Sequence, residues 1–142
     1  MYRHILIPTD GSELAERGVT HGLSLAKSLG AKVSVIFVVE PFSELTGRML
    51  EAVATYAALR KEQATSVLDR AADAAKKAGV PCETIQAENA QPHQAIIVAA
   101  EDKGCDLIVM SSHGRSGLSM LLIGSVTNKV LTQAKIPVLV CP

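Results

Sequence analysis

The residues best suited to chemistry lie between Ser111 and Ser125. Gly114 permits the closely approaching backbone that a nest of N–H groups requires. Gly124 and Ser125 open a predicted helix, whose free N–H groups and dipole favour an anion. The stretch 107–142 contains no Asp or Glu that would repel one. These features predict a phosphate-binding loop, and the alternative is a surface loop followed by a serine helix cap.

A second polar segment, Pro8-Thr9-Asp10, follows the first apolar run. A carboxylate at the end of a buried strand can accept hydrogen bonds from ribose hydroxyls, and Asp10 can also cap the helix that follows. His113 is a candidate base, although a single histidine in a loop more often supports that loop through hydrogen bonds. Asp10 and His113 lack the lysine or metal-binding carboxylates that phosphoryl transfer uses.

Several other kinds of site are excluded by their missing motifs. The sequence has no G-x-x-x-x-G-K-[ST] and no G-x-G-x-x-G after the first apolar run, so neither a P-loop nor the usual dinucleotide site is expected. It has no G-x-S-x-G hydrolase elbow. The four histidines and three cysteines show no metal-ligand spacing, so no metal site is predicted.

The elements that must position the two polar segments alternate between strand and helix. Apolar runs rich in β-branched residues predict buried strands, and helical periodicity with caps predicts the helices between them. The predicted strands are His4–Pro8, Lys32–Val39, Cys82–Ala87, Asp106–Met110 and Val138–Cys141, and the predicted helices are 12–29, 44–78, 92–103 and one that starts near Ser125 and ends before Pro137. This pattern predicts a single α/β domain over residues 1–142, with an open parallel sheet of five strands and helices on both faces.

The two polar segments also favour one strand order. In an open parallel sheet, ligands bind beyond the carboxyl ends of the strands, where the order reverses. The polar segments follow the first and fourth strands, which makes these strands neighbours in the order 3-2-1-4-5. The alternative order, 2-1-3-4-5, would place the site between strands one and three.

Composition excludes other broad classes. Fourteen basic and fourteen acidic side chains give a net charge of zero, and the chain has only four aromatic residues and no tryptophan, so nucleic-acid binding is not expected. No apolar stretch approaches the length of a membrane span, and Met1 is not followed by a signal segment. We therefore expect a cytoplasmic protein with no membrane partner.

The pattern Ser111-x2-Gly114-x9-Gly124-Ser125 resembles the nucleotide motif of the universal stress protein family, G-x2-G-x9-G-[ST]. The segments 5–12 and 136–140 also resemble the two ends of that family, so the resemblance covers the whole chain. It implies a Rossmann-like fold of the adenine nucleotide alpha hydrolase type, with strand order 3-2-1-4-5. It also implies a homodimer and, in one branch of the family, ATP binding.

The resemblance further implies which residues hold the nucleotide. Pro8, Thr9 and Asp10 would lie beside the adenine and ribose, and Val39 near the adenine. Gly114, Gly124, Ser125 and Val126 would hold the phosphates through their backbone and a hydroxyl. The full predicted set is Pro8, Thr9, Asp10, Val39, Met110, Ser111, His113, Gly114, Arg115, Gly124, Ser125 and Val126. Ser111 departs from the motif, whose first residue is glycine, and its β-carbon could crowd the ribose or α-phosphate. Any Mg²⁺ would be held largely by the phosphates and water.

These observations lead to one function and two alternatives. The leading hypothesis is a regulatory protein of the stress response that binds ATP or a related adenine nucleotide as a homodimer. The alternatives are a slow ATPase or phosphotransfer enzyme that uses the same cleft, and an interaction protein whose cleft is empty. The homodimer is expected to form through Val138–Cys141, because an uncharged edge strand favours pairing with another chain.

Overall fold

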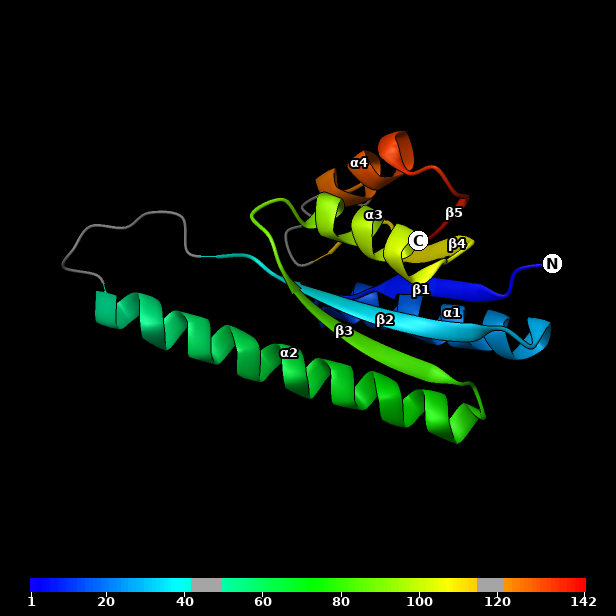
Figure 1. Cartoon of the computed structure of the whole chain (residues 1–142), viewed down its shortest axis with the longest axis horizontal. Helices are drawn as coiled ribbons and strands as arrows, with labels where there is room; N and C mark the ends of the chain where they lie inside the picture. Colours follow the sequence, from blue (N-terminus) through cyan, green and yellow to red (C-terminus); the bar gives the residue numbers. More distant parts are fainter. Residues whose placement is uncertain (42–49, 115–121) are drawn as a thin grey trace.

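The computed structural model of the chain describes residues 1–41, 50–114 and 122–142 (Figure 1). Strands and helices alternate throughout, as the sequence predicts. In chain order they are β1 (His4–Pro8), α1 (Glu13–Leu29), β2 (Lys32–Val39), α2 (Leu50–Ala78), β3 (Cys82–Glu88), α3 (Pro92–Lys103), β4 (Leu107–Ser111), α4 (Ser125–Gln133) and β5 (Val138–Cys141). The predicted start of the second helix, at Glu44, lies outside the described residues.

The five strands form one parallel sheet in the order β3-β2-β1-β4-β5, which confirms the predicted order and excludes the alternative. Ile5 of β1 pairs with Val33 of β2 on one side and with Leu107 of β4 on the other. Because β1 and β4 are neighbours, the loops that follow them meet at one edge of the sheet.

Helices cover both faces of the sheet (Figure 1). On one face, α1 and α2 bury a cluster that includes Ile7, Val35 and Phe37. On the other face, α3 and α4 bury a smaller cluster around Leu6, Ile36 and Ile108. Residues next to one another in β1 and β2 therefore point to opposite cores, as the alternation of side chains along a strand requires. Both faces are apolar because both carry helices.

The helix termini follow the sequence signals. Oγ of Ser12 accepts a hydrogen bond from the N–H of Ala15 (3.2 Å) and caps α1, and Gly30 ends that helix with φ of 66°. Of the described helices only α2 has 18 or more residues, and it is too polar to cross a membrane.

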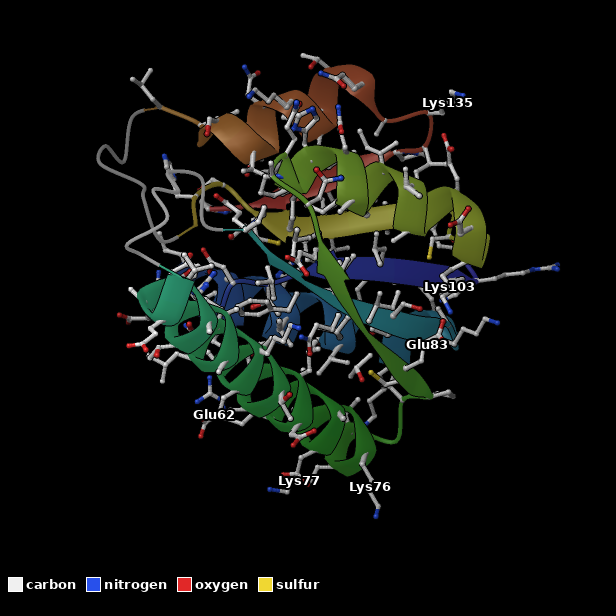
Figure 2. The ribbon with its side chains drawn as sticks, turned by 60° about the vertical axis from the view of Figure 1, so that its left-hand side comes forward. Glu62, Lys76, Lys77, Glu83, Lys103 and Lys135 are labelled. Carbon is white, nitrogen blue, oxygen red and sulfur yellow. The ribbon has the colours of Figure 1, made fainter. Side chains whose placement is uncertain are left out.

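A polar network runs from the buried His4 to the exposed Glu83 across the amino ends of the strands, opposite the edge that carries the two loops. Nε2 of His4 lies 2.7 Å from Oγ of Ser34, and that hydroxyl donates to Oε1 of Glu83 (2.8 Å). Nζ of Lys103 pairs with Oε2 of Glu83 at 3.5 Å, and Figure 2 shows these two labelled side chains close together. Burial lowers the pKa of His4, with a further contribution from the charge of Lys32. The hydrogen bond from Ser34 lowers the pKa of Glu83.

Candidate functional site

A cavity of about 670 Å³ opens at the carboxyl ends of β1, β2 and β4. Its walls come from both polar segments and from helices on both faces of the sheet. The lining residues are Pro8, Thr9, Asp10, Ala15, Ile36, Val38, Glu40, Tyr56, Arg60, Pro92, Ile96, Met110, Ser111, His113, Gly114, Leu122, Ile123, Gly124, Ser125, Val126 and Thr127. The volume lies within the range of about 300–1,000 Å³ that is usual for small-molecule sites.

The loop between β1 and α1 fixes Asp10 at the cavity wall. The N–H of Gly11 donates to Oγ1 of Thr9 (3.1 Å), and the N–H of Ser12 donates to Oδ1 of Asp10 (2.9 Å). Gly11 has φ of 80°, and a β-carbon there would lie 2.7 Å from Cγ2 of Val67. Only glycine fits this turn, because it tolerates both the positive φ and the close contact. The loop is thus ordered by its own side chains.

The start of the loop after β4 is tied directly to α4. The N–H of Gly124 donates to the carbonyl of Ser112 (2.8 Å), and Oγ1 of Thr127 donates to the buried carbonyl of Ser111 (2.9 Å). The N–H of Ser112 continues the sheet by donating to the carbonyl of Cys141 (2.8 Å). These bonds hold the first turn of α4 against the end of β4, although the chain between them is long.

Ser111, which departs from the family motif, uses its side chain to bond within its own loop. Its hydroxyl donates to the carbonyl of His113 (2.7 Å), so the side chain closes its own turn. A β-carbon at Gly18 would lie only 3.1 Å from the N of Ser111 and 3.7 Å from its Cβ, so α1 packs tightly against this residue. The hydroxyl of Ser111 therefore restricts the conformation of the loop, which a glycine at this position would leave freer.

The two motif glycines, Gly114 and Gly124, occupy positions where a side chain would lie too close to its neighbours. A β-carbon at Gly114 would lie 2.6 Å from Oδ2 of Asp10, and one at Gly124 would lie 3.1 Å from the carbonyl of Ser112. Gly124 is also the N-cap of α4, and no described side chain bonds to the helix start. The serine cap of the alternative interpretation is therefore not formed by the described residues. The first-turn residues Ser125, Val126 and Thr127 line the cavity, and the free N–H groups of such a helix start can bind an anion.

His113 is a buried side chain in the same loop. Its Nδ1 lies 3.0 Å from Oγ of Ser112, so the imidazole supports the loop as the sequence suggests. Its Nε2 is buried and has no hydrogen-bond partner among the described residues. The ring lines the cavity beside Gly114.

All but two of the predicted site residues line this cavity. The structure brings together Pro8, Thr9, Asp10, Met110, Ser111, His113, Gly114, Gly124, Ser125 and Val126. Val39 does not line the cavity: its side chain is buried in the core beneath α1 and α2, and Val38 faces the cavity instead. Arg115 lies outside the described residues.

The sequence did not predict the cavity-lining residues that lie outside the two polar segments. Ile36, Val38 and Ile96 supply an apolar side, and Tyr56 and Arg60 reach the cavity from α2. The four-residue spacing of Tyr56 and Arg60 places both on one face of a helix, but only the packing of α2 shows that this face meets the site. Within the described ranges, no group of three or more His, Cys, Asp or Glu side chains could hold a metal ion.

Comparison with known proteins agrees with this fold. A model of the universal stress protein family matches residues 1–142. The chain belongs to the universal stress protein family. It is 36% identical over 143 residues to universal stress protein MJ0531 of Methanocaldococcus jannaschii, covering 99% of this chain and 82% of the relative.

Solved structures of universal stress proteins share the architecture. The structure of protein MJ0577 superposes with a TM-score of 0.80 at 31% identity, covering 99% of this chain and 95% of the other. A universal stress protein in complex with cAMP matches with a TM-score of 0.71 at 26% identity, covering 99% and 96% of the two chains. The last of these structures shows that a relative at this level of similarity binds an adenine nucleotide.

Proposed function

We propose that this universal stress protein binds an adenine nucleotide, ATP in the first place, and acts as a cytoplasmic regulatory protein of the stress response. The observation that carries the proposal is the uncapped start of α4, which lies in the wall of a nucleotide-sized cavity together with Asp10. The cAMP complex of a relative supports the same ligand class.

The cavity offers suitable residues for the base, the ribose and the phosphates of a nucleotide. Ile36, Val38 and Met110 offer an apolar surface for the base. Asp10 offers carboxylate oxygens to the ribose hydroxyls. The N–H groups that follow Gly124 and the hydroxyl of Ser125 offer donors to the phosphates. Mg²⁺ would then be held by phosphate oxygens and water, since Mg²⁺ keeps several waters and needs few protein ligands.

We expect ATP with Mg²⁺ to stabilise the fold. At a hundred times Kd, a ligand that binds only the folded state adds about 2.7 kcal/mol to the free energy of unfolding. For a chain of this length that corresponds to a rise in Tm of roughly 5–12 °C. Thermal unfolding with and without ATP measures the shift, and release of phosphate in the same samples tests the ATPase alternative. No shift at millimolar ATP would favour the empty cleft.

Gly124→Asp should remove this shift, because a carboxylate at the start of α4 occupies and repels the phosphate position. Asn128→Asp is the matched control, since it adds the same charge one turn further along α4 at an exposed position. Calorimetric titration with ATP should show loss of binding in Gly124→Asp and wild-type affinity in Asn128→Asp. Unchanged affinity in a folded Gly124→Asp protein would remove the α4 terminus from the site.

We also propose that the protein acts as a homodimer through β5. This strand lies at the edge of the sheet, and its sequence Val138–Cys141 carries no charge. Such an edge favours pairing with a second copy of the chain.

A further inference from the structure

The wall of the cavity on the α2 side carries an arginine that the family motif does not include. Arg60 lines the cavity, one helical turn after Tyr56. Its Cζ lies 5.5 Å from the ring centroid of Phe37, and its Nη1 donates to Oε1 of Gln63 (2.6 Å). The aromatic face and the amide oxygen hold the guanidinium in one place, so its orientation is set before any ligand arrives.

Arg60 forms no ion pair within the described part of the chain. Its Nε is buried and has no hydrogen-bond partner among those residues. Nη1 donates one of its two hydrogens to Gln63. Nε and Nη2 form a separate edge of the guanidinium with two parallel donors, the geometry that matches two oxygens of a phosphate.

Arg60 is also well placed relative to the rest of the site. Among the described lining residues it is the one lysine or arginine, and Asp10 and Glu40 are the carboxylates. It lies over Phe37, in the core on the α1 and α2 side, whereas α4 covers the opposite face of the sheet. The cavity therefore has two separate places that favour an anion, the start of α4 and the guanidinium of Arg60.

We propose that Arg60 forms a second phosphate subsite of the cavity, with Nε and Nη2 as the donors. The subsite rests on the proposed nucleotide binding and adds to it a preference for nucleotides with more than one phosphate. The second phosphate comes either from the outer part of the 5′ chain, as in ATP, or from the ribose, as in adenosine 3′,5′-bisphosphate. Both offer the same pair of anionic oxygens, and separate ligands distinguish them.

The test compares affinities for AMP, ATP and adenosine 3′,5′-bisphosphate by calorimetric titration. In the wild type we expect at least one of the two larger ligands to bind more tightly than AMP. Arg60→Gln should lower the affinity for that larger ligand by about tenfold or more, which is the usual effect of losing hydrogen bonds to a charged group. The affinity of the variant for AMP should stay within about twofold of the wild-type value. Lys61→Gln, which removes an exposed charge from the next position of α2, should leave all three affinities unchanged.

Arg60→Lys separates the paired donors from the charge alone. Lysine keeps a cation near Phe37 but has no Nε–Nη2 edge, so we expect it to retain only part of the gain. This variant also carries the test if Arg60→Gln fails to fold. If the substitutions at Arg60 lower the affinity for ATP relative to AMP, the subsite binds the outer phosphates of the 5′ chain. If they lower the affinity for adenosine 3′,5′-bisphosphate relative to AMP, the subsite binds the phosphate on the ribose.

Two results would overturn the subsite. In one, folded Arg60→Gln keeps the wild-type ratios of ATP and bisphosphate affinity to AMP affinity. In the other, it loses the same factor for all three ligands, which is the result expected if Arg60 only supports the cavity wall. Either result leaves nucleotide binding by the wild type intact. Failure of the wild type to bind any of the three ligands would instead overturn the proposed function and the subsite together.

Discussion

At Ser111, a residue that departs from its family's motif takes on a structural role that glycine cannot perform. The hydroxyl reaches the carbonyl of His113, and the carbonyl of Ser111 accepts a hydrogen bond from Thr127 of α4. One residue thereby joins the end of β4, the loop that follows and the helix start that is proposed to hold phosphate. Gly18 of α1 lets that helix pack closely against the backbone of Ser111, since a β-carbon at Gly18 would lie 3.1 Å from the N of Ser111.

We expect Ser111→Ala to lower the free energy of unfolding by about 1–2 kcal/mol, since the buried carbonyl of His113 loses its donor. Ser111→Gly should lose at least as much, because it also adds backbone freedom. The affinity for AMP should fall in both variants while that for adenosine is retained, because the loop positions the phosphate donors. Urea unfolding and calorimetric titration measure the two effects.

Thr132→Ala is the control for Ser111. It removes a similar hydroxyl-to-carbonyl bond, to Asn128, from an exposed position on α4, and should change the free energy of unfolding by less than about 0.5 kcal/mol. A Ser111→Gly protein as stable as the wild type, with equal AMP affinity, would show that the hydroxyl does not hold the loop.

Individual site residues were predictable from sequence where a motif places them on one of the two loops. Asp10, Gly114 and Gly124 fall in this class, because loop residues at the carboxyl ends of neighbouring strands must meet. Val38 and Arg60 do not. Which of two adjacent valines faces the cavity depends on the register of β2, and the position of Arg60 depends on how α2 packs over Phe37.

At the scale of the elements, the sheet separates two kinds of polar structure. The carboxyl ends of β1 and β4 carry the cavity, whereas the amino ends carry the closed network of His4, Ser34 and Glu83. Since the Ser34 hydroxyl proton goes to Glu83, Nε2 of His4 is the donor in its contact with Ser34. The network has its partners within the protein, and this end of the sheet serves stability.

This network predicts that acid weakens the fold. The pKa of His4 is lower in the folded state, mainly because of burial, so the unfolded chain binds the proton more readily. The stabilising contribution of His4 is full above its ordinary pKa of about 6.5 and is lost as the pH falls below that value toward the lower folded one. The lowered pKa of Glu83 acts in the same direction at more acidic pH.

Urea unfolding at about pH 7.5 and about pH 5 measures this loss. In His4→Gln the decrease in the free energy of unfolding between the two values should be smaller than in the wild type, because the titrating group is gone. His21→Gln, at an exposed position of α1, should show the wild-type decrease. Equal decreases in all three proteins would show that His4 does not couple folding to protonation.

At the scale of the whole molecule, the strand order followed from sequence because two polar loops had to share one edge of the sheet. The pattern of buried strands and capped helices then left little choice of architecture. Seven of the ten strand ends lie at the predicted residue, and the other three, at the end of β3 and at both ends of β4, differ by one residue. The same order placed β5 at an edge of the sheet, and the structure confirms that position. In the sheet, β5 has β4 as its described neighbour and leaves its other side unpaired.

This unpaired edge predicts that β5 joins two copies of the chain. Leu139 is 37% exposed in the middle of the strand, and two copies that meet antiparallel about a twofold axis would cover both edges and close the assembly. Pro137 and Pro142 bracket the strand and limit the ladder to its few residues. Leu139→Lys should therefore shift the protein toward monomer, because it places a desolvated charge beside the seam.

Leu131→Lys is the matched control for Leu139. Leu131 is 39% exposed and belongs to α4, not to the strand proposed to pair, so the same substitution there should leave the assembly intact. Light scattering after gel filtration measures the mass of each protein. For the wild type and Leu131→Lys we expect about twice the chain mass of 15.0 kDa, and for Leu139→Lys a mass nearer to that of one chain. A wild-type mass near 15.0 kDa would rule out the dimer. Equal dissociation of Leu139→Lys and Leu131→Lys would show that the dimer interface is not formed by β5.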